Sequence, residues 1–364
     1  MRGPLTKDFK RIVIENLPLL DVRAEVEFEK GNFLNSTNLP ILNNEERHII
    51  GICYKEKGNE EATKLGYELV SGKIKEERLN SWIKYISEKP ETIIYCFRGG
   101  SRSRIAQEWI TNEIKLDVPR IEGGYKTFRN YLIDEMALEK QSYKPIILTG
   151  YTGASKTTLI NKLANGLDLE GLANHRGSSF GSHIKSQPSQ IDFENNLAYK
   201  IIQLKEKNFN NIIIEDEGKN IGKNFIPKPL QEHFSSGKYV VLDSSLEERI
   251  SNTLKEYVID SQKEYIDFYG EEGLEKWFTY IQESMNRVKK RFGGDKLNQV
   301  IKDLEKAYNH QLSTNNFDLH RDWIEKFLKD YYDPLYKKSI KTSPESLLFK
   351  GNYNEVLEFL QNIN

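Results

Sequence analysis

The stretch PIILTGYTGASKTT, residues 145–158, runs from an apolar segment through a glycine-containing loop into a segment of helical character. Its apolar start is typical of a strand buried on both faces of a parallel sheet. The two glycines allow a tight turn in which several backbone N–H groups point toward one ligand. Lys156 and Thr157 then fall at the start of the expected helix, where anions bind favourably. The stretch therefore predicts an α/β domain with a phosphate-binding loop.

The spacing of this loop is that of a Walker A motif, with one departure. Lys156 is expected to neutralise phosphate charge, and the Thr157 hydroxyl is expected to hold a magnesium ion. Ser155 stands where the pattern has its second glycine, and a left-handed backbone would cost a serine about 1–2 kcal/mol there. The alternative is a turn that binds no ligand. The predicted phosphate-binding residues are Gly150, Thr152, Gly153, Ser155, Lys156 and Thr157.

Two further segments extend this site along the sequence. IIIEDEG, residues 212–218, resembles a Walker B strand, and Asp216 is the expected metal-facing acid, with Glu215 and Glu217 as alternatives. LANHRGSSFG, residues 172–181, is a polar loop suited to an anion or a nucleobase. A histidine in such a loop is also common as a solvated or capping residue. The candidate substrate-binding residues of this loop are His175, Arg176, Ser178 and Ser179.

A second chemical motif, YCFRGGSRS, occupies residues 95–103. Cys96 ends an apolar strand, and a helix is expected from about Ser103. Adjacent glycines favour an anion-binding nest of backbone N–H groups, and nearby arginines favour a thiolate over a thiol. Cys96 is therefore the candidate nucleophile, and a buried structural cysteine is the alternative. The candidate anion-binding residues are Arg98, Gly99, Gly100, Ser101 and Arg102.

Two enzyme classes use such a loop. Cys96 and Arg102 fit the Cys-x5-Arg spacing of phosphatases that form a cysteinyl phosphate, whereas rhodanese-like sulfurtransferases carry sulfur or selenium on the cysteine. The upstream stretch DVRAEVEFEKGNFLNSTNLP, residues 21–40, resembles the opening motif of the rhodanese family. This resemblance favours a rhodanese-like first domain, in which the opening motif shapes the fold and takes no part in catalysis.

The organisation of the chain follows from its apolar patterns. RIVIENL, ETIIYC, PIILTG, NIIIED and KYVVLD are predicted strands, and SRIAQEWITNEI, KTTLINKLANGL and FENNLAYKIIQLKEKNF are predicted helices. From about residue 246 the pattern is helical and charged, without a strand signal. The predicted fold class is α/β. Its predicted parts are a rhodanese-like α/β domain at 1–139, a P-loop NTPase-like α/β domain at 140–250, and a helical C-terminal region at 251–364 packed on the P-loop domain.

The composition of the 364 residues excludes several classes of protein. Hydrophobic residues make up 38% and charged residues 29%, and no stretch has the roughly 18–20 apolar residues of a membrane span. The two cysteines, Cys53 and Cys96, do not form a CxxC pair, which disfavours a disulfide scaffold or a cysteine-rich zinc site. We expect a cytoplasmic protein without a membrane partner. Because the net charge is −1, nucleic-acid binding requires a local basic patch.

The CFRGGSRS loop joined to the Walker A loop and LANHRGSSFG resembles the bacterial tRNA 2-selenouridine synthases, as does GICYKEKGNEEATKLGYELV at residues 51–70. The resemblance runs from about residue 10 to at least residue 250. It implies a transferase that replaces the sulfur of 2-thiouridine at the tRNA wobble position with selenium from selenophosphate. It also implies a geranyltransferase activity that first attaches a geranyl group to that sulfur from geranyl diphosphate.

This resemblance assigns roles to the two loops. The Walker A loop would hold the diphosphate of geranyl diphosphate. Cys96 would act in the selenium step, either by carrying selenium or by assisting its delivery, and residues 98–102 would bind selenophosphate. No tightly bound cofactor is expected, and Mg²⁺ is compatible with the loop.

A tRNA substrate requires a basic surface, and NRVKKRFGGDK at residues 286–296 is the best linear candidate. Its candidate tRNA-binding residues are Arg287, Lys289, Lys290 and Arg291. A solvated helix face is the alternative for this segment.

Two other functions of the whole protein stay open at this point. One is a P-loop kinase or NTPase fused to a regulatory rhodanese or Cys-x5-Arg phosphatase-like domain, and the other is a non-enzymatic phosphate-binding module with a redox-sensing cysteine.

Overall fold

The computed structural model describes residues 3–339 and 345–363, and their contacts divide the chain into two compact units. The first unit holds the chain up to Gln141 together with residues 189–207. The second holds residues 142–188 and the chain from Asn208 onward. Residues 189–207 fall within the predicted P-loop domain at 140–250, whereas the contacts group this segment with the first unit.

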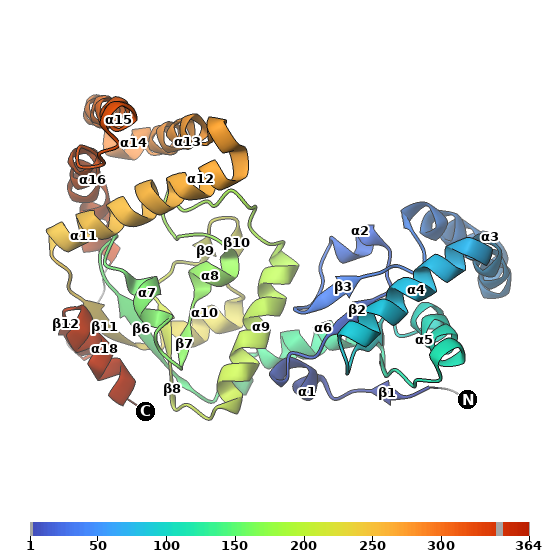
Figure 1. The fold of residues 1–364 in the computed structure, drawn as a ribbon. Coiled ribbons are helices and arrows are strands. Elements are labelled where there is room, and N and C mark those ends of the chain that lie inside the picture. The colour runs from blue at the N-terminus through green and yellow to red at the C-terminus, as the bar shows by residue number, and fades with distance from the viewer. Residues whose placement is uncertain (1–2, 340–344, 364) are drawn as a thin grey trace. The chain divides into compact units, whose positions relative to one another are not determined.

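The first unit is built on a five-stranded parallel sheet with the order β1-β5-β4-β2-β3 (Figure 1). The residues of β2 and β4 are all buried, as expected for inner strands of a parallel sheet. The strands are β1 (Leu5–Thr6), β2 (Leu19–Asp21), β3 (Ser36–Asn38), β4 (Ile93–Tyr95) and β5 (Arg120–Ile121). The helices are α1 (Phe9–Ile14), α2 (Glu25–Phe28), α3 (Asn44–Leu69), α4 (Gly72–Glu88), α5 (Ser101–Ile114), α6 (Gly124–Glu135), a 3₁₀ turn (Leu138–Lys140) and α9 (Gln190–Glu206).

The predicted strand RIVIENL is wrong, because this segment forms α1. The Asp8 side chain accepts a hydrogen bond from the backbone N–H of Arg11 and caps the helix. Phe9, Ile12 and Val13 are buried. Their i, i+3, i+4 spacing is that of a helix face.

Helix α3 bends sharply in its middle. Gly58 has a φ of 83°, which separates an N-terminal half from a C-terminal half of this 26-residue element. Glycine adopts this backbone conformation without the steric cost that other residues incur. The two halves of α3 therefore run in different directions.

The second unit has its own five-stranded parallel sheet, in the order β12-β11-β6-β8-β7. The strands are β6 (Lys144–Thr149), β7 (Gly166–Leu167), β8 (Asn211–Glu215), β11 (Lys238–Leu242) and β12 (Leu347–Gly351). A separate antiparallel pair comprises β9 (Asn220–Ile221) and β10 (Asn224–Phe225). The predicted strands PIILTG, NIIIED and KYVVLD are confirmed as β6, β8 and β11.

The helices of this unit surround the sheet and form the C-terminal region (Figure 1). They are α7 (Lys156–Ile160), α8 (Leu169–Ala173), α10 (Lys228–Ser235), α11 (Leu246–Thr253), a π-helical segment (Leu254–Asp260), α12 (Ser261–Tyr269), a 3₁₀ turn (Gly270–Glu272), α13 (Gly273–Arg287), α14 (Lys289–Phe292), α15 (Gly294–Thr314), α16 (His320–Phe327), a second π-helical segment (Leu328–Tyr332), α17 (Asp333–Ser339) and α18 (Tyr353–Asn362).

The helical character of the C-terminal region is confirmed, but the absence of a strand there is not. The segment Leu347–Gly351 forms β12, which pairs in parallel with β11 at the edge of the sheet. The predicted helix KTTLINKLANGL is also too long, because only Lys156–Ile160 is helical. A Cβ atom at Gly166 would lie 2.2 Å from the carbonyl oxygen of Ile160, so the chain turns back closely on itself there.

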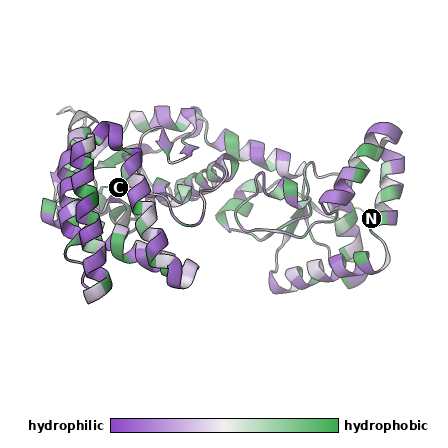
Figure 2. Ribbon diagram, turned by 90° about the horizontal axis from the view of Figure 1, so that it is seen from above, coloured by the Kyte–Doolittle hydropathy of each residue, from purple (hydrophilic) through white to green (hydrophobic). Residues whose placement is uncertain are grey.

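Figure 2 shows hydrophilic and hydrophobic residues alternating along the helices. Among residues 3–339 and 345–363, none of the helices is both long and apolar enough to cross a membrane.

Candidate active sites

Cys96 lies directly after β4, at the start of the loop that leads into α5. Its side chain is buried, with 3% of its surface exposed, and its thiol donates a hydrogen bond to the Ser103 hydroxyl at 3.2 Å. The backbone of α6 holds the loop in place, because Tyr125 N–H donates to the Cys96 carbonyl at 2.9 Å and Lys126 N–H donates to the Phe97 carbonyl at 3.0 Å. The Cys96 sulfur, which the sequence predicts as the nucleophile, therefore lies at the base of a loop held by backbone hydrogen bonds.

The loop after Cys96 presents its backbone donors without internal partners. Gly99 has a φ of 63°, and a Cβ atom at this position would lie within 2.9 Å of the backbone of Ile121, Gly123 and Gly124. In the described part of the chain, the N–H groups from Arg98 to Ser103 donate no hydrogen bond to another backbone group. These donors, together with the N-terminus of α5, are suited to an anion.

The two loop arginines differ in their environment. Arg102 donates two hydrogen bonds to Glu27, at 2.5 and 3.0 Å, and Arg47 approaches the same carboxylate at 3.1 Å. Burial opposes ionisation of Glu27, but Arg102 outweighs it and lowers the pKa of this carboxyl. Arg98 is exposed and forms no ion pair within residues 3–339 and 345–363. Arg98 is therefore the arginine whose charge is available to a ligand.

A cavity of about 1110 Å³ opens above Cys96. The predicted residues Arg98, Gly100, Ser101 and Arg102 line it, and Gly99 supports the loop from behind. The first half of α3 forms another wall, with Ile50 and Tyr54 among its lining residues, and Ile191 of α9 also contributes. These apolar walls have no signal in the cysteine motif, because they come from distant segments of the chain.

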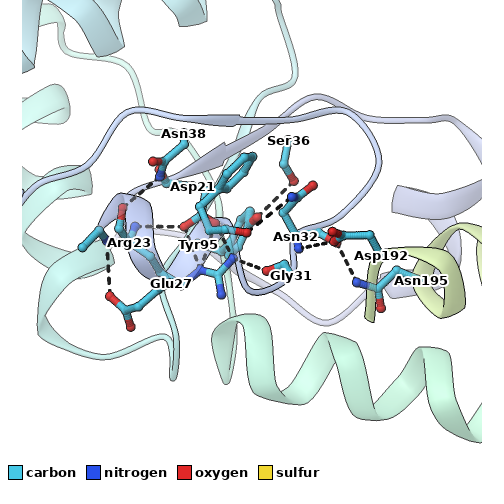
Figure 3. Close-up of polar contacts among 12 residues, drawn as sticks. Asp21, Arg23, Glu27, Gly31, Asn32, Ser36, Asn38, Tyr95, Asp192 and Asn195 are labelled. Carbon is cyan, nitrogen blue, oxygen red and sulfur yellow. Dashed lines mark hydrogen bonds and ion pairs between the residues drawn. The ribbon is translucent and has the colours of Figure 1, made fainter. Parts of the chain in front are cut away.

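The opening motif shapes the fold around this cavity, as the sequence analysis expects (Figure 3). Arg23 and Asp21 form a buried ion pair at 2.6 Å, and the guanidinium lies 4.0 Å from the centre of the Tyr125 ring. Burial raises the pKa of Asp21, although Arg23 works in the opposite direction. Arg23 also donates to the Gly31 carbonyl at 2.9 Å, and the Asn38 side chain donates to the carbonyls of Asp21 and Arg23.

Helix α9 fixes the neighbouring loop within the same unit (Figure 3). The Asn32 N–H donates to the Asp192 carboxylate at 2.8 Å, and the Asn195 side chain donates to the Asn32 carbonyl at 2.6 Å. Arg129 of α6 in turn donates to the Asn195 side-chain oxygen at 2.7 Å. These positioning residues carry no local sequence signal, since their partners lie more than sixty positions away.

The phosphate-binding loop connects β6 to α7 in the second unit. Gly153 has a φ of 82°, and a Cβ atom there would lie 2.7 Å from the carbonyl oxygen of Arg249. Ser155 has a φ of 63° and a ψ of 37°, which is the left-handed conformation that the Walker A pattern assigns to glycine. The serine therefore carries a strain of about 1–2 kcal/mol. The Lys156 ammonium donates to the Gly150 carbonyl at 3.0 Å across the loop.

A cavity of about 550 Å³ lies above this loop. Of the residues predicted from the sequence, it is lined by Thr152, Gly153, Ser155, Lys156, Thr157, Arg176, Ser178 and Asp216. Gly150, His175 and Ser179 do not line it. The structure thus gathers the Walker A loop, the end of β8 and part of the 172–181 loop around one space.

Acidic side chains surround the Lys156 and Thr157 end of this cavity. The Thr157 hydroxyl donates to the Glu170 carboxylate at 2.9 Å, and the Glu170 N–H donates to the Glu215 carboxylate at 3.1 Å. Burial, and then the charge of Glu217, raises the pKa of Glu170 to about 8, while burial raises the pKa of Glu217 to about 7. Burial, and then Glu170, raises the pKa of Glu215 to about 8. Burial therefore favours the protonated form of these carboxyls.

Asp216 is the metal-facing acid that the sequence predicts, whereas Glu170 has no local sequence signal. Asp216 lines the cavity, but the carboxylate bonded to Thr157 belongs to Glu170, which lies in α8. Within residues 3–339 and 345–363, no cluster of three His, Cys, Asp or Glu side chains has the arrangement of a metal site. Oxygen donors from Thr157 and the glutamates are nevertheless the type that Mg²⁺ prefers.

The C-terminal helical region completes this cavity. Arg249 of α11 donates to the Thr152 carbonyl at 2.9 Å and pairs with Asp333 at 2.5 Å. Tyr257, Tyr332 and Tyr336 line the cavity. The Tyr336 ring lies 5.5 Å from the Lys156 ammonium. The pKa of Lys156 is raised even though burial alone would lower it, because Tyr336 and the glutamates favour the charged form.

The candidate residues of the 172–181 loop have different environments. The His175 ring accepts a hydrogen bond from the Gly177 N–H at 3.2 Å, which is a turn-forming contact. Arg176 lies 3.3 Å from the Glu264 carboxylate, and the Ser178 hydroxyl accepts from the Tyr257 hydroxyl at 2.9 Å. Only Arg176 and Ser178 reach the cavity.

The basic segment lies at the junction of α13 and α14. Lys289, Lys290 and Arg291 are exposed and form no ion pair with any residue that the structure describes. Arg287 instead donates to the carbonyl of Ser179 at 3.1 Å. Arg287 thus connects the basic segment to the loop that contributes Arg176 and Ser178 to the cavity.

The comparisons with known proteins cover up to 98% of the chain. The family model described as the tRNA 2-selenouridine synthase AAA domain matches residues 143–364. A protein of Sulfurovum sp. (strain NBC37-1) named tRNA 2-selenouridine synthase is 46% identical over 98% of this chain and 98% of its own. Proteins of the same name from Hydrogenovibrio crunogenus and Alcanivorax borkumensis are 42% and 43% identical, each over 98% of both chains. A solved N-terminal domain of an ATP/GTP binding protein from Clostridium difficile 630 is 30% identical and covers 35% of this chain and 98% of that domain, with a TM-score of 0.32.

Proposed function

Because this chain belongs to the tRNA 2-selenouridine synthase family, we propose that it converts 2-thiouridine at the wobble position of tRNA into 2-selenouridine. The relatives match over nearly their full length, so the two units are both part of the proposed activity. The rhodanese-like character of the first unit stays a prediction from its sequence motifs.

The first proposed step is geranyl transfer to the 2-thiouridine sulfur. A bond forms between sulfur and the first carbon of the geranyl group, the bond from that carbon to the diphosphate oxygen breaks, and the N3 proton leaves. The Walker A loop would hold the departing diphosphate, with Lys156 stabilising its developing charge. If the reaction uses Mg²⁺, Thr157 and the adjacent glutamates would hold the ion. The charge of Mg²⁺ would then add to the stabilisation of the departing diphosphate.

The second proposed step is the entry of selenium at C2. Alkylation turns a poor leaving group into a thiol, so the selenium of selenophosphate can bond to C2 while the carbon–sulfur bond breaks and geranyl thiol leaves with a proton. Water then cleaves the selenium–phosphorus bond and gives 2-selenouridine and phosphate. This sequence needs no oxidant or reductant. A perselenide on Cys96 would need a reductant for release, so we assign Cys96 an assisting role at the loop that binds selenophosphate.

One observation supports the division into two steps. The first cavity contains the Cys96 thiol beside the backbone N–H groups of its loop, whereas the second contains Lys156 next to the carboxyl groups of Glu170 and Glu217. Two different phosphorus compounds, one with a selenium atom and one with a diphosphate group, match these two sites.

The proposed function is tested by nucleoside mass spectrometry of tRNA incubated with the protein. With geranyl diphosphate alone, we expect S-geranyl-2-thiouridine, and with selenophosphate as well, we expect 2-selenouridine. Nucleotide hydrolysis without tRNA, together with unmodified nucleosides in every reaction, would support a kinase or NTPase and would overturn the proposal. Thiol oxidation as the sole change would support the redox-sensing module.

A further inference from the structure

A narrow apolar slot adjoins the Cys96 cavity. It has a volume of about 130 Å³ and lies between the two halves of α3 and the helix α5. The cavity and the slot share Leu42, Ile50, Tyr54, Ser101 and Arg102 as lining residues, so one opens beside the other.

The slot leads away from the cysteine loop. Helix α5 starts within that loop at Ser101, and Ile105 and Trp109 follow at four-residue intervals along the slot. Eight residues of helix span about 12 Å. Trp109 lies near other aromatic rings, with its ring centre 6.1 Å from that of Trp82 and 6.3 Å from that of Tyr67. A ligand group in the slot would thus extend from the loop toward an aromatic end.

The lining of the slot is suited to an apolar group. Ala62 and Val70 are buried there, and the polar Thr63 hydroxyl already donates to the Asn59 carbonyl at 2.7 Å. A polar ligand group would find few partners in this lining. Cavities of about 150 Å³ hold benzene, so 130 Å³ is enough for one branched five-carbon isoprene unit. The other isoprene unit of a geranyl chain would lie in the adjoining cavity.

We propose that this slot binds the distal part of the prenyl chain of an S-alkylated 2-thiouridine while Cys96 and its loop face C2. The proposal rests on the proposed function, because it places the intermediate of the two steps. A site that accepted unalkylated 2-thiouridine would have no use for a long apolar extension. Binding of the chain would align the carbon–sulfur bond that breaks and would select the alkylated base over the unmodified one.

The test uses the full chain with selenophosphate and two tRNA substrates, one S-geranylated and one S-methylated at the 2-thio group. The wild-type protein should convert the geranylated tRNA with a kcat/KM higher by about tenfold or more, because even one methylene in a fitted pocket changes kcat/KM by about 10–200-fold. Ala62→Phe places a ring in the slot and should reduce this preference to within about threefold. Glu68→Phe adds the same ring to an exposed position of α3 outside the slot and should retain the preference.

A second variant distinguishes an effect on the slot from misfolding of the protein. Trp109→Ala lengthens the slot and should raise the ratio of activity on S-farnesyl to S-geranyl tRNA, a gain that damage to the fold does not produce. Two results would overturn the proposal that the slot binds the prenyl chain. One is equal activity of the wild-type protein on the S-geranylated and S-methylated tRNAs, and the other is an equal loss of activity on both in Ala62→Phe.

The failure of the proposed function has a different signature. If the wild-type protein selenates neither S-alkylated tRNA, the proposed function fails. The slot is then tested by quenching of tryptophan fluorescence on titration with S-geranyl-2-thiouridine. Quenching that is retained in Glu68→Phe and lost in Ala62→Phe supports the slot, and its absence in the wild-type protein overturns it.

Discussion

At the scale of single residues, Arg102 separates two interpretations of the cysteine loop. In a Cys-x5-Arg phosphatase the arginine faces the phosphate, whereas Arg102 here directs two hydrogen bonds at Glu27. Such bidentate pairs are among the stronger charged contacts in proteins. The pair stabilises the start of α5 against α2 and leaves Arg98 and the backbone N–H groups for the ligand, which disfavours a phosphatase mechanism.

Cys96→Ser is expected to abolish selenium incorporation and leave geranylation largely intact. The reason is that Cys96 faces the first cavity only, whereas the proposed diphosphate site belongs to the second. Nucleoside mass spectrometry should show accumulation of S-geranyl-2-thiouridine. Cys53→Ser is the matched control, because Cys53 lies on α3 and lines neither cavity. Selenation at the wild-type rate by Cys96→Ser would refute the assignment.

Lys156→Ala is expected to lower the rate of geranylation by about 10²–10³, which is typical for the loss of one electrostatic contact to a developing charge. Selenation of 2-thiouridine tRNA should fall with it. The variant should still selenate tRNA that was geranylated beforehand, since the Cys96 loop is unchanged. Failure on that pre-geranylated substrate by a folded variant would mean that the phosphate-binding loop also serves the selenium step.

The carboxyl groups near Thr157 make stability depend on pH. Glu170 has a pKa raised from 4.5 to about 8 by burial and by Glu217. Below pH 4.5 the folded and unfolded chains both hold this proton. Between pH 4.5 and about 8 the unfolded chain releases it while the folded protein keeps it, so the free energy of unfolding falls as pH rises.

Glu170→Gln removes this dependence, so the variant should gain stability relative to the wild type as the pH rises from 5 to 8. Denaturant unfolding at both pH values measures the difference. Glu283→Gln, an exposed substitution in α13, is the control and should show no such gain. A Glu170→Gln protein with the wild-type pH dependence would contradict the raised pKa.

At the scale of elements, the junction of α13 and α14 carries the predicted tRNA contacts. Replacing Lys289, Lys290 and Arg291 with alanine should weaken tRNA binding. Each lost phosphate contact should lower the slope of log K against log salt by about 0.7–0.9. Arg287→Ala is the informative comparison, because Arg287 bonds to Ser179 and should change the 172–181 loop more than the salt slope. An unchanged slope in the triple variant would place the tRNA surface elsewhere.

The elements that the sequence predicted correctly are those with a strong local pattern. The strands β6, β8 and β11 have continuous apolar runs, and α5 follows a glycine-rich loop. The segment that forms α1 has equally dense apolar residues, and the features that distinguish it from a strand are the Asp8 cap and the helical spacing of Phe9, Ile12 and Val13. Strand β12 is a five-residue edge strand after a helical region, and its pairing with β11 is a long-range contact that no local pattern encodes.

At the scale of the whole molecule, the sequence predicts the two loops because the residues that set the backbone geometry of each loop lie within its own motif. The second cavity also depends on Glu170, Tyr257 and Tyr336, which are brought to the loop by α8 and the C-terminal helices. The walls of the first cavity likewise depend on α3 and α9. Such residues are recognisable only once the chain has folded, since each has an ordinary local sequence.

The first unit is built from two separate segments of the chain, residues 1–141 and 189–207. This arrangement predicts how a fragment with only the first segment behaves. Residues 1–141 alone lack α9, whose Tyr199 packs 6.0 Å from Phe128 and whose Asn195 accepts from Arg129. We expect this fragment to be cleaved quickly by protease and to be protected when a peptide of residues 189–207 is added. A fragment as resistant as the same region of the full chain would show that α9 is dispensable.

During synthesis this arrangement imposes an order of events. The ribosome adds about 5–20 residues per second, so several seconds pass between the release of Gln141 and the arrival of Lys207. Throughout that interval Phe128 and the neighbouring aromatic surface lack the helix that covers them. The first unit is therefore completed only after residues 142–188, which include β6 and the phosphate-binding loop, have been synthesised. During this period a chaperone can bind the uncovered aromatic surface around Phe128.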